Sequence, residues 1–187
     1  MFIRSERLFL RPGWPEDWAE LLALLDDEEV VRNMAQASWP FGPEEARALA
    51  GSRQAARHPH FFITLPGAHG SRLIGAVGLA EVEDETQLGF WIARSHWNRG
   101  YATEAVRAVL TLARTLGHDR ISGCHFIDNP ACARVLAKAG FRPTGETRPR
   151  RSPARTGAEP ALIHVLNLGP AGNCPAGDDD EQVMRAA

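Results

Sequence analysis

The stretch that most constrains how this chain can fold is an apolar run leading into a short polar turn and then into a long amphipathic pattern. Residues 88–93 (Leu-Gly-Phe-Trp-Ile-Ala) are apolar enough for a buried strand. After residue 100 the apolar residues recur every three or four positions, which predicts a helix with one buried stripe over about four turns. The stripe consists of Val106, Val109, Leu110, Ala113 and Leu116.

The turn before this helix has the features of an anion site. Gly100 has no side chain, so a ligand can approach the backbone closely. The first N–H groups of the helix have no helical acceptor, and the positive end of the helix dipole lies at the same place. These features favour phosphate binding. The alternative is an ordinary strand–turn–helix connection, because Arg-Gly before a helix is common.

Charge and cysteine content argue against several classes of protein. The chain has 21 basic and 23 acidic residues, a net charge of −2, whereas a nucleic-acid binder would show a strong basic excess. Its three cysteines have no regular spacing, so we expect neither a disulfide framework nor a metal site. The N-terminus carries charges where a signal peptide needs an apolar core, and no apolar run approaches the roughly 20 residues of a membrane span. We therefore expect a cytoplasmic protein with no nucleic-acid and no membrane partner.

The remaining patterns alternate between strands and helices. Strands are expected at 2–11, 61–65, 73–79, 86–93, 121–127, 141–147 and 161–168. Helices are expected at 15–34 with a break near Asp26-Asp27, and at 43–57, 101–116 and 130–139. This order predicts one three-layer α/β domain over residues 1–168. Residues 169–187 are acidic and lack periodicity, so we expect a disordered tail there.

Two motifs carry a resemblance to a known family. The stretch Trp97-Asn-Arg-Gly-Tyr-Ala-Thr-Glu-Ala105 resembles the acetyl-CoA pyrophosphate loop of the GNAT acyltransferase superfamily, usually Gln/Arg-x-x-Gly-x-Gly/Ala. Gly100 and Ala102 match that pattern, and Trp97 stands where Gln or Arg is usual. Residues 128–141 resemble the family's Asn-x-x-Ser helix that ends in Gly-Phe, with cysteine in place of serine. The resemblance covers nearly all of residues 3–168 and is greatest to the branch of ribosomal-protein-alanine N-acetyltransferases.

The resemblance implies a GNAT-like fold, with a mixed, mostly antiparallel sheet that splays at the cofactor cleft and helices on both faces. Acetyl-CoA would be the cosubstrate, and no metal is expected. Its pantetheine arm would lie in the gap against the backbone of one strand, formed by Phe90, Trp91 and Ile92. Its pyrophosphate would be held by the backbone of the loop, formed by Arg99, Gly100, Tyr101, Ala102 and Thr103. Asn129 would contact the cofactor near the pantetheine arm.

The residues that move protons are less closely defined. Many family members use a tyrosine as general acid, but Tyr101 is the only tyrosine here and lies in the phosphate loop. Cys132 is the candidate acid, because it replaces the serine proposed as acid in the resembling branch; plain packing is the alternative. His125 and Glu81 are candidate bases, and His125 is favoured because an ordinary histidine has a pKa near 6.5. A structural role is the alternative for His125.

Two features concern the acceptor. Trp39 and Phe41 lie in the loop between the first helices, either as a wall of the substrate pocket or as a hydrophobic plug. Five arginines lie late in the chain, and we expect a solvated loop, with guidance of an acidic acceptor or of the cofactor's 3′-phosphate as the alternative. These are Arg142, Arg148, Arg150, Arg151 and Arg155.

The expected function follows from the two motifs together. We expect a monomeric or homodimeric N-acetyltransferase, in which a primary amine attacks acetyl-CoA directly within a ternary complex. The acceptor would be a protein N-terminal α-amine or a small-molecule amine. The alternative is a non-catalytic acyl-CoA-binding regulatory module, which the missing tyrosine and Trp97 would fit.

Overall fold

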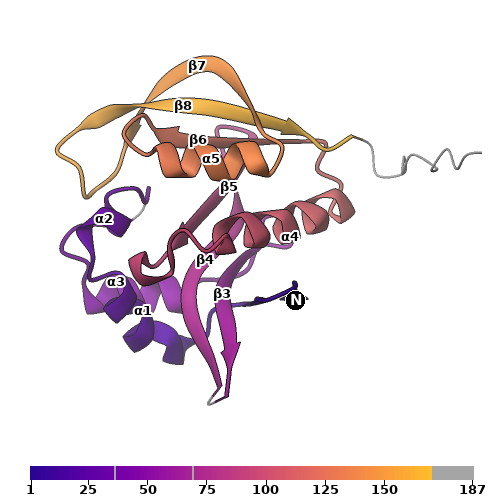
Figure 1. Cartoon of the computed structure of the whole chain (residues 1–187). Helices are drawn as coiled ribbons and strands as arrows, with labels where there is room; N and C mark the ends of the chain where they lie inside the picture. Colours follow the sequence, from indigo (N-terminus) through magenta and orange to yellow (C-terminus); the bar gives the residue numbers. More distant parts are fainter. Residues whose placement is uncertain (36, 69, 170–187) are drawn as a thin grey trace, which may run out of the picture.

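Eight strands form one sheet, in the order β1-β2-β3-β4-β5-β6-β8-β7 (Figure 1). The computed structural model describes residues 1–35, 37–68 and 70–169, so the expected tail lies almost wholly outside the described residues. All neighbouring strands are antiparallel except β5 and β6, which are parallel. The strands are β1 (Ile3–Arg4), β2 (Phe9–Arg11), β3 (His60–Gly67), β4 (Gly70–Val82), β5 (Glu85–Ile92), β6 (Arg120–Phe126), β7 (Arg142–Arg151) and β8 (Ala158–Asn167).

Helices cover both faces of this sheet. The helices are α1 (Trp18–Leu24), α2 (Glu28–Val31), α3 (Pro43–Ala50), α4 (Tyr101–Thr115) and α5 (Pro130–Lys138), with short 3₁₀ helices at Pro15–Asp17 and Arg94–His96. The expected three-layer α/β fold with a mostly antiparallel sheet is therefore confirmed. No helix in the described parts of the chain is both long and apolar enough to cross a membrane.

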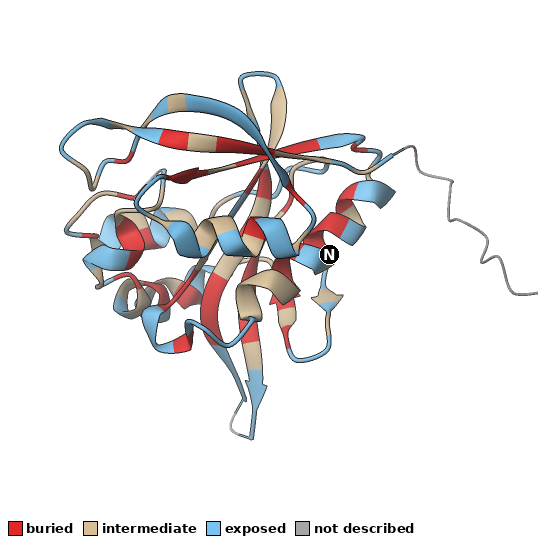
Figure 2. Cartoon of the chain, turned by 45° about the horizontal axis from the view of Figure 1, so that its top comes forward, coloured by how far each residue is buried: buried red, intermediate tan, exposed pale blue. Residues whose placement is uncertain are grey.

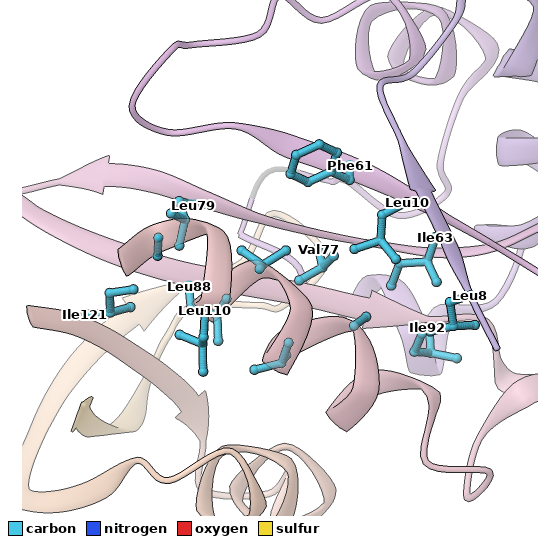
Figure 3. Close-up of a cluster of buried hydrophobic side chains, with 14 of the residues drawn as sticks. Leu8, Leu10, Phe61, Ile63, Val77, Leu79, Leu88, Ile92, Leu110 and Ile121 are labelled. Atoms are coloured by element: carbon cyan, nitrogen blue, oxygen red, sulfur yellow. The ribbon is translucent and has the colours of Figure 1, made fainter. Parts of the chain in front are cut away.

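Two apolar cores lie on the opposite faces of the sheet. On β3, Phe61 and Ile63 belong to the cluster beneath α4 (Figure 3), whereas Phe62 between them belongs to the cluster beneath α1 and α3. This is the alternation that a strand buried on both faces requires. Figure 2 shows the buried residues running through the central strands. The predicted stripe of α4 is confirmed, because Val106, Val109, Leu110 and Ala113 are all buried.

The N-terminal elements are more broken than the sequence suggests. The expected first strand is two short strands, because the backbone N–H of Ser5 donates to the Leu8 carbonyl at 3.0 Å and forms a turn. The predicted break in the first helical region is confirmed at Asp27, whose side chain accepts from the N–H of Glu29 and caps α2. Helix α3 ends at Ala50, seven residues earlier than expected.

Strand β7 is longer than expected and continues through Pro149 to Arg151. The sequence favours a loop there, because proline is not expected in a central strand. However, β7 is an edge strand, where a missing N–H group need not remove a ladder hydrogen bond. Arg148 and Arg150 therefore lie on one face of the strand and Arg151 on the other, beyond the register shift between Pro143 and Thr147.

Candidate active site

Strands β5 and β6 are hydrogen-bonded to each other over only two residue pairs. These are Gln87 with Ser122 and Leu88 with Gly123. Past them β5 continues to Ile92, paired with β4, and β6 continues to Phe126, paired with β8. The edges that face each other beyond Leu88 and Gly123 thus have no ladder partner and can pair with an extended amide chain. We refer to this region as the gap; the three residues expected beside pantetheine, Phe90, Trp91 and Ile92, lie along its β5 edge.

The turn that follows β5 presents backbone N–H groups at the start of α4. Asn98 and Gly100 both have positive φ, at 60° and 79°, and Gly100 is the N-cap of the helix. The first bond of the helix runs from the N–H of Glu104 to the Gly100 carbonyl at 3.1 Å. The N–H groups of the three preceding residues, Tyr101, Ala102 and Thr103, therefore have no helical acceptor. This geometry fits an anionic group such as pyrophosphate.

Trp97, which departs from the family's loop pattern, has a structural role in this turn. Its indole N–H donates to the carbonyl of Ile92 at 2.6 Å, which ties the turn to the last residue of β5. The departure therefore leaves the backbone cradle intact. This bond cannot be predicted from the sequence, because the two residues approach only once the turn has formed.

A second brace holds the other side of the turn. Glu104 accepts from the hydroxyl of Ser5 at 2.8 Å and from the backbone N–H of Arg7 at 2.7 Å. Arg7 pairs with the same carboxylate at 2.7 Å and donates to the Arg99 carbonyl at 3.0 Å. Burial raises the pKa of Glu104, but these bonds outweigh it and hold the pKa below its ordinary value. No local sequence pattern predicts this brace, because its residues lie more than 90 positions apart in the chain.

Asn129 and Cys132 lie at the start of helix α5, which follows β6 at the open end of the gap. The side-chain oxygen of Asn129 accepts from the N–H of Cys132 at 3.2 Å, so Asn129 is the N-cap of α5. This bond leaves the amide N–H₂ of Asn129 as a donor for a ligand. Burial, and secondarily Cys124, raises the pKa of the Cys132 thiol to about 12. Proton transfer from it to a thiolate of ordinary pKa is uphill by about 5 kcal/mol, so Cys132 is better suited to donating a weak hydrogen bond.

We expect Cys132 to resist alkylation in the folded protein. In a variant whose other cysteines are replaced (Cys124→Ser, Cys174→Ser), iodoacetamide at pH 8 should react about a thousandfold more slowly than with a free cysteine, since the raised pKa lowers the thiolate fraction by that factor. The measurement is the alkylation rate by mass spectrometry, and the same variant unfolded in urea is the control. Equal rates in the folded and unfolded protein would contradict the raised pKa of this partly buried thiol.

The two candidate bases lie apart. His125 is buried, its Nδ1 lies 2.8 Å from the Phe126 carbonyl, and its ring centroid lies 5.1 Å from that of His164. Burial and then the charge of His125 lower the pKa of His164. Glu81 is exposed, lies 3.9 Å from Nδ1 of His58, and pairs with Thr86 at the strand ends away from the gap. The structure therefore does not bring Glu81 to the other predicted catalytic residues.

The two aromatic residues of the first loop pack into the core beneath α1 and α3. Phe41 is buried within this cluster, and Trp39 packs against it while keeping part of its surface exposed. This is the arrangement expected of a hydrophobic plug. Only the exposed part of Trp39 remains available to a pocket.

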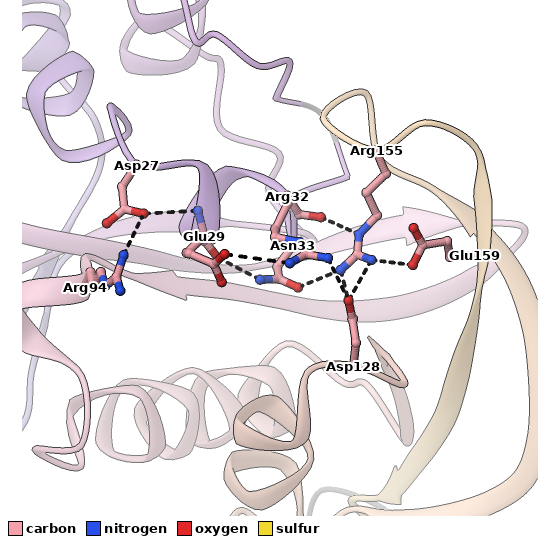
Figure 4. A network of polar contacts seen from close by, with 8 residues as sticks. All are labelled: Asp27, Glu29, Arg32, Asn33, Arg94, Asp128, Arg155 and Glu159. Atoms are coloured by element: carbon pink, nitrogen blue, oxygen red, sulfur yellow. Dashed lines mark hydrogen bonds and ion pairs between the residues drawn. The ribbon is translucent and has the colours of Figure 1, made fainter.

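Helix α2 connects the two strands that diverge at the gap (Figure 4). At its start, Asp27 lies 3.7 Å from Arg94, which follows β5. At its end, Arg32 pairs at 2.9 Å with Asp128, which follows β6. These contacts tie together the open ends of β5 and β6 on the face of α1.

Arg155 reinforces this connection from the β7–β8 loop. Its side chain is only 2% exposed, donates to the Arg32 carbonyl at 2.8 Å and pairs with Asp128 at 2.9 Å. It also pairs with Glu159, and its guanidinium lies 3.9 Å from the centroid of the Phe126 ring. The expectation that the late arginines form a solvated loop is therefore wrong for Arg155, because several acceptors and an aromatic ring compensate its burial.

Comparison with known proteins identifies the family to which this chain belongs. The family model described as "Acetyltransferase (GNAT) domain" matches residues 7–142. The chain belongs to the GNAT acetyltransferase family. A curated relative, "Uncharacterized N-acetyltransferase YoaA" of Bacillus subtilis, is 29% identical over 154 residues, which is 78% of this chain and 85% of the relative. The chain is thus an acetyl-CoA-dependent acyltransferase, and the predicted family is confirmed.

Solved structures share the fold at low identity. The acetyltransferase (GNAT family) from Bacillus anthracis has a TM-score of 0.76 at 23% identity, covering 90% of this chain and 99% of that one. RimL, described as a ribosomal L7/L12 alpha-N-protein acetyltransferase in complex with coenzyme A, has a TM-score of 0.75 at 16% identity, covering 91% of this chain and 99% of that one.

No group of three or more His, Cys, Asp or Glu side chains suited to a metal occurs within the described ranges.

Proposed function

We propose that this acyltransferase transfers the acetyl group of acetyl-CoA to a primary amine, and that the amine is the α-amine of a protein N-terminus. The observation that carries the proposal is the gap, which opens beyond two residue pairs and ends at the turn whose N–H groups face outward from α4. Pantetheine is an extended chain with two amides, and pyrophosphate is an anion. The free β5 edge suits the pantetheine, and the start of α4, which follows it, suits the pyrophosphate. The two elements thus follow each other as the two groups do in the cofactor.

All the predicted cofactor residues except Arg99 take a role in this proposal, with Gly100 as the N-cap that shapes the turn. The backbone of residues 90–92 bonds the pantetheine amides, the N–H groups of residues 101–103 bind the pyrophosphate, and Asn129 donates to the cofactor through its free amide N–H₂. Holding the thioester and amine together supplies several kcal/mol of the barrier, since it replaces a bimolecular encounter by a positioned one.

Proton transfer bears on the choice of amine. The structure leaves the protonated thiol of Cys132 near the start of α5 and His125 buried against a second histidine, so neither forms an obvious strong acid or base. An α-amine has a pKa near 8 and a lysine one near 10.4, so releasing the neutral lysine costs about 3 kcal/mol more near neutral pH. An α-amine needs less help, and the occurrence of an alpha-N-protein acetyltransferase among the structural neighbours is consistent with this choice.

The test combines cofactor binding with acceptor turnover. We expect acetyl-CoA to bind in titration calorimetry, with a dissociation constant between about 1 μM and 1 mM. Thiol release should be faster with a lysine-free peptide that has a free N-terminus than with the matched Nα-acetylated peptide that contains a lysine. Polyamines and aminoglycosides complete the panel, and faster turnover of either would replace the α-amine by a small-molecule amine.

Two outcomes would overturn the proposal more broadly. Tight acetyl-CoA binding with no turnover of any acceptor would favour the non-catalytic acyl-CoA-binding module. Failure to bind acetyl-CoA at millimolar concentration would contradict both readings. We further propose a monomer or homodimer located in the cytoplasm, to be checked by light scattering and by fractionation of the host cells.

A further inference from the structure

One arginine near the gap lacks a carboxylate partner. Five arginines of the described residues are at least partly buried as whole residues, and four of them form ion pairs: Arg11, Arg32, Arg148 and Arg155. The fifth, Arg150 on β7, has no carboxylate partner among the described residues. One amino group of its guanidinium donates to the side-chain oxygen of Gln87 and to the sulfur of Cys124, the latter at 3.2 Å. The Nε and the second amino group have no partner in the described parts of the chain.

Arg150 lies where the gap begins, on the face of the sheet opposite α4. Leu88 and Ile121 belong to the cluster beneath α4, so the residues before and after them in the strands, Gln87 and Ser122, face the other way. A shallow hollow on that side is lined by Gln87, Ser122, Ile163, Arg148 and Arg150 with residues of the β4–β5 turn. Gln87 and Ser122 form the first of the two residue pairs before the gap. An acceptor in this hollow would therefore approach the thioester from the face of the sheet opposite α4 and α5.

The neighbouring carboxylates are already engaged with other arginines. Glu83 and Glu85, which line the hollow, lie 3.6 Å from Arg148 and 3.1 Å from Arg120. Glu159 stands directly across from Arg150 in the strand register, yet it pairs with Arg155. The hollow therefore contains one half-buried cation that no neighbouring carboxylate neutralises. Burying a charge without a partner is costly, and a bound anion would remove that cost.

We propose that Arg150 binds a carboxylate of the acceptor, so that the preferred substrate is an amine with a carboxylate a few bonds from the reacting nitrogen. The N-terminus of a peptide that begins with Asp or Glu has this chemistry. One amino group of the guanidinium is engaged by Gln87 and Cys124, which hold the side chain in place, so the Nε–H and the second amino group are the charged donors left for a carboxylate oxygen. This inference rests on the proposed function, since it assigns the acceptor of that reaction.

The experiment uses peptides that differ only in one charge. Thiol release is measured with two matched pairs of lysine-free peptides, one beginning with Asp or Asn and the other with Glu or Gln. We expect the acidic member of at least one pair to have the higher kcat/KM by about tenfold to a hundredfold, the range for a hydrogen bond to a charged group. In Arg150→Gln this preference should disappear, mainly through KM, and Arg150→Lys should retain part of it because it keeps the charge with a different placement of the donors.

The matched control is Arg151→Gln. Arg151 is exposed, lies next to Arg150 on the same strand and points to the opposite face, so its loss removes the same charge without touching the hollow. This variant should keep the preference of the unmodified protein, and acetyl-CoA binding should be unchanged in all three variants.

The outcomes separate this inference from the proposed function. Turnover of both members of each pair without preference, or a preference that survives in Arg150→Gln, would overturn the role of Arg150 and leave the acetyltransferase proposal intact. Turnover of polyamines alone would also overturn it. Failure of the unmodified protein to bind acetyl-CoA would overturn the proposed function first.

Discussion

Gly100→Val should abolish acetyl-CoA binding while leaving the protein folded. Gly100 has a φ of 79° at the N-cap of α4, a conformation that β-branched residues rarely adopt. A Cβ atom there would also lie 3.4 Å from a terminal nitrogen of Arg7, on the side of the turn where the brace to Glu104 forms. The substitution therefore disturbs the N–H groups that we assign to pyrophosphate. In titration calorimetry we expect the dissociation constant to rise by a factor of at least about 100, equivalent to nearly 3 kcal/mol.

Gly117→Val is the matched control for this prediction. Gly117 follows the other end of α4 with a φ of 78°, and a Cβ there meets no atom within 4 Å. Both substitutions pay the same backbone strain, about 1–2 kcal/mol, so thermal unfolding should show comparable losses of stability. Only Gly100→Val should lose the cofactor. If Gly117→Val lost binding equally, the effect would come from instability of the helix rather than from the anion site.

Regular periodicity made most of the fold predictable. The α4 stripe, the alternation of strands and helices and the break near Asp27 were all evident, because each depends on residues within one turn or one strand. The errors lie where distant partners decide the outcome. Strand β7 includes Pro149 because it occupies an edge of the sheet. Its position in the sheet is not written in its own sequence.

The site shows the same division. The phosphate turn is local, so Gly100 and the start of α4 could be located from sequence, and the resemblance supplied the matching helix at Asn129. The braces were not predictable, because Arg7 contacts Glu104 from 97 positions away and Arg155 contacts Asn33 from 122 positions away. Sequence composition showed a group of late arginines, but only the three-dimensional arrangement separates the buried Arg155 from Arg150, which has no carboxylate partner among the described residues.

Arg155→Met should cause the largest loss of stability among the late arginines. The side chain is 2% exposed and contacts α2, Asp128, Glu159 and the ring of Phe126 (Figure 4). Removing it leaves the Arg32 carbonyl without this donor, while Asp128 and Glu159 are 43% and 41% exposed and regain water. We therefore expect a loss of about 2–3 kcal/mol, below the full cost of breaking a wholly buried pair, and a fall in Tm of about 5–10 °C.

Arg148→Met separates burial from charge. Arg148 also pairs with two carboxylates, Glu83 and Glu146, but its side chain is 39% exposed. Exposed pairs contribute little, so its Tm should change by no more than about 2 °C. Similar losses in the two variants would contradict the view that Arg155 is a buried connection between α2 and the far half of the sheet.

The pH dependence gives an independent check on the same contact. The hydrogen bond from Arg155 is the main cause that holds the pKa of Asp128 below its ordinary value. A carboxylate with a lowered pKa contributes stability that is present above its unfolded pKa, near 4, and is lost as the pH falls through its folded pKa. The stability difference between the unmodified protein and Arg155→Met should therefore be full at pH 7 and should shrink below about pH 4. A difference that stayed constant down to pH 3 would mean that Arg155 acts through packing on Phe126 rather than through its charge.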